Sequence, residues 1–449
     1  MWQLDLLPGP GDEAAAKGDA GLIGWFERSR AALLLLGAVY LMPRALLILF
    51  DVTPASDADF YYTRAISLAD GLGYLSNKGQ ATAFWPPGWS LALSAVFRAF
   101  GPSVAAVGLF NLACAALSGW LVLDLGRRLF GSELAARIGL LLLALYPNNA
   151  AYVPLALTEV FYTTLLLGAC WLMIARPSWP GLVAAGVVMG AATLVKAQTL
   201  VVVPLVLGIA ALQAPRLWLA LRGAAARAVL VIIVAALVIS PWTLRNYREL
   251  GAWVAVSSNG GITLLTGNND SADGAYTPKD PAVLALDART ELTELEYDSE
   301  AKRLGFEWIK ADPGRFAALM PLKLLRLWGP DGEAIWFYER GAAAYPANAG
   351  LFVAVRLANQ AWYVLLLLGF AAAAPVMVRQ RLRSGQNLVG WWLLPYGIAA
   401  YPTAIAIIFS GQSRFHYPAM PFIAMTCGWL LAEWLIRRNA RVEAGATLH

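Results

Sequence analysis

The amino-acid sequence predicts an all-α protein that crosses a membrane many times. Of its 449 residues, 59% are hydrophobic and 14% are charged, whereas soluble proteins have about 25% charged residues. The mean hydropathy is +0.58. The apolar residues fall in runs close to the roughly 20 residues that a helix needs to cross a bilayer. Short polar segments that carry arginine separate these runs, which is typical of a polytopic helical membrane protein.

Composition excludes several other classes of protein. The net charge of +5 is explained by basic residues in cytoplasmic loops, so no nucleic-acid partner is expected. Cys114, Cys170 and Cys427 lie inside apolar runs. They are predicted to be packing residues, with no disulfide framework and no metal cluster. The first 26 residues lack the pattern of a cleavable signal and are expected to form a cytoplasmic tail.

The apolar runs and the arginines between them predict the topology. The runs occupy residues 31–50, 86–100, 104–125, 134–152, 156–175, 180–195, 198–213, 224–243, 350–377, 388–409 and 418–436. The basic residues near their ends are Arg28, Arg30, Arg127, Arg128, Arg137, Arg176, Arg216, Arg222, Arg227, Arg379, Arg381, Arg383, Arg437, Arg438 and Arg441. The positive-inside rule places all of these arginines in the cytoplasm, together with both termini.

One run does not fit this alternation. Only one crossing is allowed between the outer end of the first span and Arg127, yet two runs lie there. The first, 86–100, is short, begins with Pro86-Pro87-Gly88 and contains Arg98. It is therefore predicted to lie in the outer interface, with Trp85 and Trp89 at the level of the lipid headgroups. About ten crossings remain, within a range of roughly 10 to 12.

The topology divides the chain into four parts. They are the tail 1–26, an N-terminal transmembrane module 27–243 with the outer loop 51–103, an extracytoplasmic segment 244–349, and a C-terminal transmembrane module 350–449. Residues 283–311 are expected to be helical. Phe316 to Trp328 have the pattern of an amphipathic helix that returns to the membrane.

Several polar groups fall on the outer side in this topology. They are Asp57, Asp59, Glu159, Lys196, Arg245, Lys323, Arg326, Arg414 and His416. Carboxylates beside cations at the lipid boundary suit transfer from a lipid-linked phosphate. The cations would hold the phosphate, and a carboxylate would deprotonate or orient an acceptor hydroxyl.

Each of these groups also has a structural explanation. Asp57 and Asp59 could cap a helix or be solvated, and Glu159 could cap the span that it begins. Lys196 could extend along the interface to reach water. A lone interfacial histidine such as His416 is more often hydrogen-bonded within the protein than catalytic. Arg44 lies inside the first span and is expected to face the protein interior.

Taken together, the ordered motifs resemble the GT-C superfamily of membrane glycosyltransferases. The resemblance is to the branch of aminoarabinose transferases and protein O-mannosyltransferases. It is carried by Asp57 with Tyr61, Ala65, Leu68 and Gly71, by Phe84 to Trp89, by Leu157 to Phe161, by Pro241 to Tyr247 with residues 257–269, and by Arg414 to Pro418 with Pro421.

This resemblance implies a GT-C fold and an inverting transfer from a polyprenyl-phosphate sugar. Asp57 would be the base and Asp59 a possible second acid. Lys196, Arg245, Arg414 and His416 would bind the donor phosphate, while Glu159, Tyr61 and Trp85 would position the acceptor. The expected place is the outer face of a bacterial inner membrane, and the acceptor would be a lipid, a glycan or a protein.

Two departures from the family pattern qualify these expectations. Relatives often have Asp-Glu where this chain has Asp57-Ala58, which leaves the need for a divalent metal such as Mg²⁺ or Mn²⁺ open. The last span is expected to end near Leu435, so the large soluble C-terminal domain of some relatives is not expected here. Two alternative functions also fit the composition, namely an O-antigen-type ligase or polymerase and a lipid-linked sugar transporter or flippase.

Overall fold

The structure is a computed structural model that describes residues 21–446, with side chains as far as Arg441. Most of the predicted cytoplasmic tail lies outside the described residues, and the part that is described begins a helix at Leu22. Within the described residues the protein is all-α, apart from two isolated β-bridges, Val52–Ala342 and Leu75–Ala81. The predicted fold class is confirmed.

The helices follow the predicted apolar runs closely. They are α2 (Leu22–Arg28), α3 (Arg30–Leu47), α4 (Asp57–Ala69), α5 (Gly88–Phe100), α6 (Val104–Phe130), α7 (Glu133–Ala144), α8 (Pro147–Ala151), α9 (Glu159–Ala175), α10 (Trp179–Val195), η1 (Thr199–Val201), α11 (Val202–Leu212), α12 (Leu217–Leu250), α13 (Gly260–Gly267), α14 (Pro281–Asp287), α15 (Glu294–Ala311), α16 (Pro313–Trp328), α17 (Ala334–Gly341), η2 (Pro346–Asn348), α18 (Ala349–Arg383), η3 (Trp391–Leu393), α19 (Leu394–Ile408), η4 (Ser413–Ala419) and α20 (Met420–Ala446).

Six helical stretches among the described residues are long and apolar enough to cross a membrane. They are 30–47, 104–130, 217–250, 346–383, 391–408 and 413–441. Three shorter apolar stretches, 159–175, 179–195 and 199–212, accompany them. The protein is therefore a multi-pass membrane protein. The number of about ten crossings stays a prediction.

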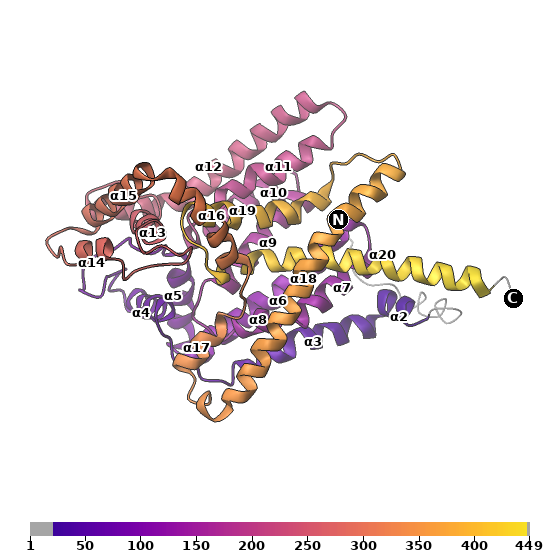
Figure 1. Ribbon diagram of the computed structural model, residues 1–449, viewed down its shortest axis with the longest axis horizontal. Helices are drawn as coiled ribbons and strands as arrows, with labels where there is room; N and C mark the ends of the chain where they lie inside the picture. Colours follow the sequence, from indigo (N-terminus) through magenta and orange to yellow (C-terminus); the bar gives the residue numbers. More distant parts are fainter. Residues whose placement is uncertain (1–20, 447–449) are drawn as a thin grey trace.

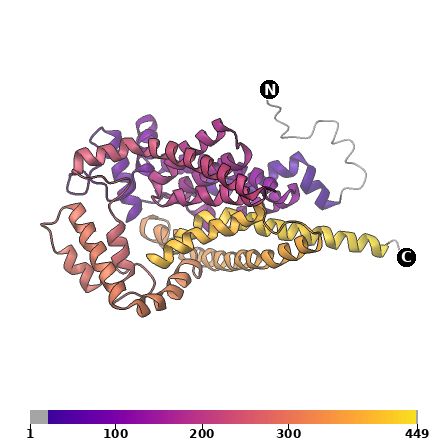
Figure 2. The same cartoon turned by 90° about the horizontal axis from the view of Figure 1, so that it is seen from above.

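The long helices run side by side along the long axis of the molecule (Figures 1 and 2). One end carries α4, α5 and the helices α13 to α17, all of which belong to segments predicted to lie outside. The opposite end carries the α11–α12 and α18–α19 connections and the end of α20. These are the segments with clustered arginines, so the two ends differ as the positive-inside rule requires.

Helix α5 is the apolar run that was predicted not to span. Its 13 residues give a length of about 20 Å, which is short of the roughly 30 Å hydrocarbon layer. The predicted place of Trp89 at the headgroups is wrong. Its side chain is fully buried, packs against Phe110 and Phe161, and donates from the indole nitrogen to the Ala156 carbonyl at 2.9 Å. Because α5 packs on α4, α6 and α10, this face of the helix is covered by protein.

The helices of residues 244–349, the segment predicted to lie outside, are tied to the loop 51–103 by one carboxylate. Glu294, at the start of α15, accepts hydrogen bonds from the Ala83 amide at 2.9 Å, from the Ser258 hydroxyl at 2.6 Å and from the Thr82 hydroxyl. The helices predicted over 283–311 and 316–328 are present as α14, α15 and α16. The outer loop and the outer segment therefore form one packed layer above the spans.

Close backbone packing holds the central helices together. A Cβ atom on Gly428 of α20 would lie 2.5 Å from the Ala135 carbonyl oxygen and 2.5 Å from the Gly139 nitrogen of α7. Only glycine therefore allows this approach. Small residues play the same part wherever membrane helices cross closely, because packing replaces the hydrophobic effect in lipid.

Candidate active site

Asp57 is the first residue of α4, and its side chain pairs with Arg414, which is more than 350 positions later in the chain. Its Oδ2 atom lies 2.6 Å from Nη2 of Arg414, with 21% and 15% of the two side chains exposed. The start of a helix favours a negative charge, so α4 itself helps to hold the ionised carboxylate. The preceding Ser56 has φ +54°, a value that non-glycine residues seldom adopt. Local backbone geometry thus turns Asp57 toward Arg414.

Arg414 lies between two carboxylates in the short helix η4. Its Nε atom is 3.7 Å from Oε1 of Glu333, which precedes α17. The other oxygen of Glu333 accepts from the Arg414 amide at 3.2 Å and from the Ser413 hydroxyl at 2.9 Å. Glu333 therefore fixes both the backbone and the side chain of the residue that pairs with Asp57.

A second ion pair lies beside the first. Glu159 begins α9 and is buried, and its Oε1 atom is 3.6 Å from the Nζ atom of Lys196, at the end of α10. Burial lowers the pKa of Lys196; the charge of Glu159 opposes this and the charge of Arg414 adds to it. Lys196 and Glu159 thus pair with each other where α10 ends and α9 begins.

An aromatic ring and a tyrosine join the two pairs into one cluster. The Phe415 ring centroid lies 5.4 Å from Nζ of Lys196 and 5.4 Å from Cζ of Arg414, within the range of cation–π attraction. Burial raises the pKa of Tyr61 well above its usual value, and the charges of Asp57 and Glu159 add to this while that of Arg414 opposes it. Tyr61 is therefore a neutral phenol within range of both carboxylates.

Trp85 and Tyr61 form part of an aromatic wall beside Asp57. The Trp85 ring lies 6.1 Å from that of Tyr61, 6.0 Å from that of Phe60 and 5.6 Å from that of Phe84. The motif that the sequence singled out in the first outer loop therefore packs against the start of α4. This places Trp85 next to the cluster without an ionic role.

Two predicted residues lie apart from the cluster and have other partners. Asp59 is exposed, and its charge acts on Arg64. Burial lowers the pKa of Arg64, and the nearby Tyr74 and Asp59 oppose this effect. Arg245 donates to the carbonyls of Tyr74 at 2.8 Å and Thr82 at 2.6 Å. Arg245 thereby holds the outer loop against α12.

His416 is buried beneath the cluster and does not face it. Its Nδ1 atom lies 2.7 Å from the Leu327 carbonyl oxygen, and Nε2 lies 3.1 Å from Oδ1 of Asp331. The ring stacks between those of Trp328 and Tyr363. Since both ring nitrogens already have protein acceptors, His416 is placed to fasten η4, and with it Arg414, to the segment before α17.

Asp331 is the centre of that buried network. Besides His416, its carboxylate accepts from Tyr146 at 2.5 Å, Asn148 at 2.6 Å and Asn359 at 2.8 Å. Burial alone would raise the pKa of Asp331, but the hydrogen bonds and the charge of His416 hold it below its usual range. The network joins α8, α18 and η4 under the candidate site.

Sequence reasoning missed Glu333, Phe415 and Asp331. Glu333 and Asp331 are two of many acids in the outer segment, and no spacing distinguishes them from the solvated ones. Phe415 lies between two residues that the sequence did single out, so its place in the cluster follows only from how η4 turns. Their roles depend on contacts between segments far apart in the chain.

The residues of the cluster do not fit a divalent metal ion. The guanidinium of Arg414 occupies the position between the carboxylates of Asp57 and Glu333 that a cation would need. Among the residues that the structure describes, no group of three or more His, Cys, Asp or Glu side chains could hold a metal. No step of the chemistry below is therefore routed through a metal ion.

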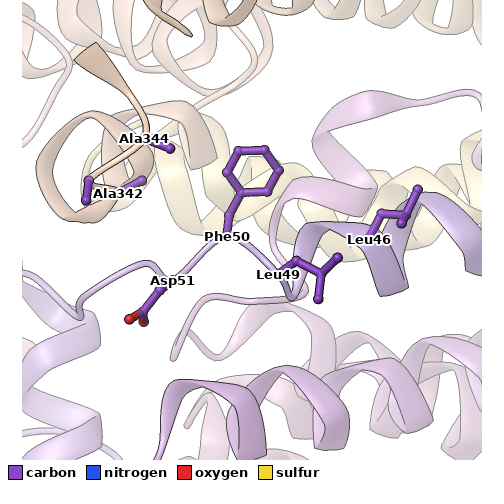
Figure 3. A pocket seen from close by; sticks show the side chains of 7 residues that line it. Leu46, Leu49, Phe50, Asp51, Ala342 and Ala344 are labelled. Carbon is purple, nitrogen blue, oxygen red and sulfur yellow. The ribbon is translucent and has the colours of Figure 1, made fainter. Parts of the chain in front are cut away.

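An apolar pocket opens beside the outer end of α3. Its volume is about 510 Å³, and Leu46, Leu49, Phe50, Asp51 and residues 342–344 line it (Figure 3). A neighbouring cavity of about 420 Å³ continues between α3, α8, α17 and α18. Ile335 and Tyr338 of α17, the helix that follows Glu333, are among the residues that line this second cavity.

Comparison with known proteins supports the resemblance found in the sequence. A family model described as dolichyl-phosphate-mannose-protein mannosyltransferase matches residues 85–243. No curated protein matches the chain. The matched part runs from the Trp85 motif of the first outer loop to the outer end of α12, and it includes Glu159 and Lys196.

Among solved structures, two of an archaeal oligosaccharyltransferase from Archaeoglobus fulgidus align with most of the chain. AglB with an inhibitory peptide and a dolichol-phosphate has 15% identity and a TM-score of 0.55, over 94% of this chain and 52% of that chain. The complex with zinc and sulfate has 16% identity and a TM-score of 0.54, over 93% and 50%. This chain thus spans about half the length of these proteins.

A third structure is ArnT from Cupriavidus metallidurans bound to undecaprenyl phosphate. It has 14% identity and a TM-score of 0.43, over 90% of this chain and 77% of that chain, a likeness too low to support an argument. The two archaeal structures establish the arrangement of the helices and nothing about the substrate, because sequence identity is low. The chain therefore has the GT-C fold, as its ordered motifs imply.

Proposed function

We propose that this protein is an inverting glycosyltransferase that uses a polyprenyl-phosphate sugar. It would move the sugar to an acceptor hydroxyl or phosphate at the outer face of a bacterial cytoplasmic membrane. The observation that carries the proposal is the pairing of Asp57 with Arg414 beside Glu159 and Lys196, on a GT-C fold. The acceptor would be a lipid, a glycan or a protein.

Asp57 is the proposed base. One of its oxygens is bound by Arg414, which leaves the other for the proton of the acceptor hydroxyl. The acceptor oxygen would attack the anomeric carbon as the bond from that carbon to the phosphate oxygen breaks. The electron pair leaves with the polyprenyl phosphate, and the proton passes to Asp57. A carboxylate suffices as the base when the leaving group is a phosphate that needs no protonation.

Arg414 and Lys196 are the proposed ligands of the leaving phosphate. A guanidinium has five N–H donors, so Arg414 can hold Asp57 and Glu333 and still donate to a phosphate oxygen. Lys196 and Arg414 both lie over the Phe415 ring, each 5.4 Å from its centroid. Two cations aimed at the charge that develops on the leaving group stabilise the transition state more than the ground state.

Support for a lipid-linked donor comes from the comparisons and from the apolar cavities. AglB was solved with a dolichol-phosphate, and this chain shares its fold. The cavities beside α3 and α17 are lined mainly by apolar side chains, and a polyprenyl chain would gain about 25 cal/mol per Å² of apolar area buried there. In this proposal Arg245 and His416 have structural roles. Arg245 holds the outer loop, and His416 holds η4.

The test is a transfer assay with purified protein in proteoliposomes. We expect a polyprenyl phosphate or its sugar adduct to co-purify, as seen by lipid mass spectrometry. We also expect labelled sugar to reach an acceptor with inverted anomeric configuration, which NMR of the product would read. A transporter would instead move labelled solute across the bilayer without forming a glycosidic bond. That result, or retention of configuration, would overturn the proposal.

A further inference from the structure

The Tyr152 hydroxyl is buried at the candidate site without a hydrogen-bond partner. Tyr152 follows α8, and 1% of its surface is exposed. Its phenolic oxygen has no partner among the described residues. Buried hydroxyls in native proteins almost always have partners, and each exception calls for an explanation. The Tyr152 hydroxyl is therefore a group that something outside the described protein is expected to complete.

The Oε2 atom of Glu159, whose charge acts on Tyr152, is the second such atom. Glu159 is 1% exposed, and Oε1 is the atom that pairs with Lys196. Oε2 is buried and has no hydrogen-bond partner among the described residues. The Tyr152 hydroxyl can donate and Oε2 of Glu159 can accept, and these are the two roles that a ligand hydroxyl complements.

Tyr152 packs against η4, the short helix that carries Arg414. Burial raises the pKa of Tyr152 well above its usual value, with further contributions from Glu333 and Glu159, while Arg414 opposes them. The phenol is thus neutral and can donate. Its ring contacts that of Tyr417 edge to face, with centroids 4.8 Å apart, and this contact fixes the direction of the hydroxyl.

We propose that Tyr152 and Glu159 form a subsite for one hydroxyl group of the transferred sugar. The sugar hydroxyl would donate to Oε2 of Glu159, and its oxygen would accept from the Tyr152 hydroxyl. The subsite rests on the proposed function and adds to it a residue outside the family motifs quoted above. A polar site of this kind discriminates strongly against a substrate that lacks the hydroxyl, because the buried groups are then left without partners.

Lys196 and Arg414 of the same cluster are the proposed ligands of the donor phosphate. Two sets of residues would therefore bind the two parts of the donor. The cations would hold the phosphate, and Tyr152 with Glu159 would read the sugar. Removal of the Tyr152 hydroxyl is therefore expected to weaken binding of the sugar-bearing donor while leaving the bare lipid phosphate unaffected.

The test uses Tyr152→Phe in the full-length protein, which removes one oxygen atom and keeps the ring. The probes are a polyprenyl-phosphate hexose donor, a set of its monodeoxy analogues, and undecaprenyl phosphate as a competitive inhibitor. We expect the KM for the intact donor to rise about 10-fold, with the inhibition constant of undecaprenyl phosphate unchanged. One deoxy analogue should show the same loss with the wild-type protein and no further loss with Tyr152→Phe.

Tyr396→Phe is the matched control, because the Tyr396 hydroxyl already donates to the Phe370 carbonyl at 3.0 Å, away from the cluster. It should leave the KM unchanged. An unchanged KM in Tyr152→Phe, with or without a rise in melting temperature, would overturn the subsite and leave the transferase intact. Equal losses for all the deoxy analogues would also overturn it. If the wild-type protein transfers no sugar from any donor, the proposed function itself fails, which is a different result.

Discussion

Nη2 of Arg414 and Oδ2 of Asp57 lie 2.6 Å apart, although Asp57 begins α4 and Arg414 lies just before α20. Oε1 of Glu333 lies 3.7 Å from Nε of the same arginine. The pair therefore draws together the N-terminal module, the outer segment and the C-terminal module. Any change in how these three parts pack would move the proposed base relative to the proposed phosphate ligand.

The first prediction separates the two acids of the first outer loop. Asp57→Asn should lower kcat for sugar transfer by about 10²–10⁴-fold, because the amide cannot take the acceptor proton. Asp59→Asn is the matched control, since Asp59 is exposed in the same helical turn, and it should transfer at close to the native rate. The measurement is initial rate in proteoliposomes at equal protein. A native rate in Asp57→Asn would remove the base from this position.

A second prediction concerns the geometry of Arg414. Arg414→Lys keeps the positive charge but loses the planar set of donors that reaches Asp57 and Glu333 together. We expect kcat/KM to fall by about 10- to 100-fold. Arg245→Lys provides the comparison, because Arg245 binds two backbone carbonyls of the outer loop and the Asn246 side chain, and no carboxylate of the cluster. It should lower the melting temperature and leave kcat nearly unchanged. Equal kinetic losses in the two variants would count against a special role for Arg414.

A third prediction is a pH dependence of stability caused by Lys323. Lys323 is buried in α16 and its Nζ atom donates to Oδ1 of Asn268 at 2.7 Å and to the carbonyls of Ile407 and Ile408 at the end of α19. Burial lowers its pKa to about 8, against roughly 10.4 in an unfolded chain. Between these two values the unfolded chain binds more protons than the folded chain. The Lys323 contribution to the free energy of unfolding therefore rises with pH over this window.

Melting temperatures in detergent from pH 7 to pH 10.5 would measure this contribution. Lys323→Met should flatten the slope over the window between pH 8 and about 10.4, because the titrating group is gone. The exposed Lys279 offers a control, and Lys279→Met should retain the native slope. A native slope in Lys323→Met would mean that other groups cause the dependence.

The fourth prediction tests the contact between α7 and α20. Gly428→Val places carbon atoms where the backbone of α7 lies, because even a Cβ atom would approach the Ala135 oxygen to 2.5 Å. We expect a destabilisation of about 1–3 kcal/mol, as for other overpacked cores, visible as a lower melting temperature. Gly208→Val in α11 is the control, since a Cβ atom there meets nothing within 4 Å. Similar melting temperatures for the two variants would show that the helices separate easily.

Much of the architecture follows from the sequence because membrane insertion is a local problem. Each apolar run must satisfy its own backbone hydrogen bonds in lipid, so it becomes a helix wherever it lies in the chain. The short run that begins at Pro86 correctly predicts a helix that is too short to span. Trp89 was placed wrongly, because an indole ring suits both a headgroup layer and a packed protein interior, and only its neighbours decide between them.

The candidate site divides in the same way. Asp57, Glu159, Lys196 and Arg414 could be placed on one side of the membrane from charge alternation alone. That alternation does not say which cation meets which carboxylate. His416 and Arg245 are predicted on the same side of the membrane as the cluster, yet they have other partners. Hydrogen bonds act only over a few ångströms, so the same side of the membrane does not mean the same site.

The sequence by itself determined a multi-pass helical protein, its apolar runs, and the ordered motifs that resemble GT-C transferases. Those properties depend on hydropathy, length and the order of residues along the chain. Only the tertiary structure decided that Arg414 pairs with Asp57, that Glu333 completes the pair, and that Tyr152 and Glu159 each leave a buried atom without a partner. Such contacts join residues from distant segments, and their distances are set by how the helices pack rather than by any local pattern.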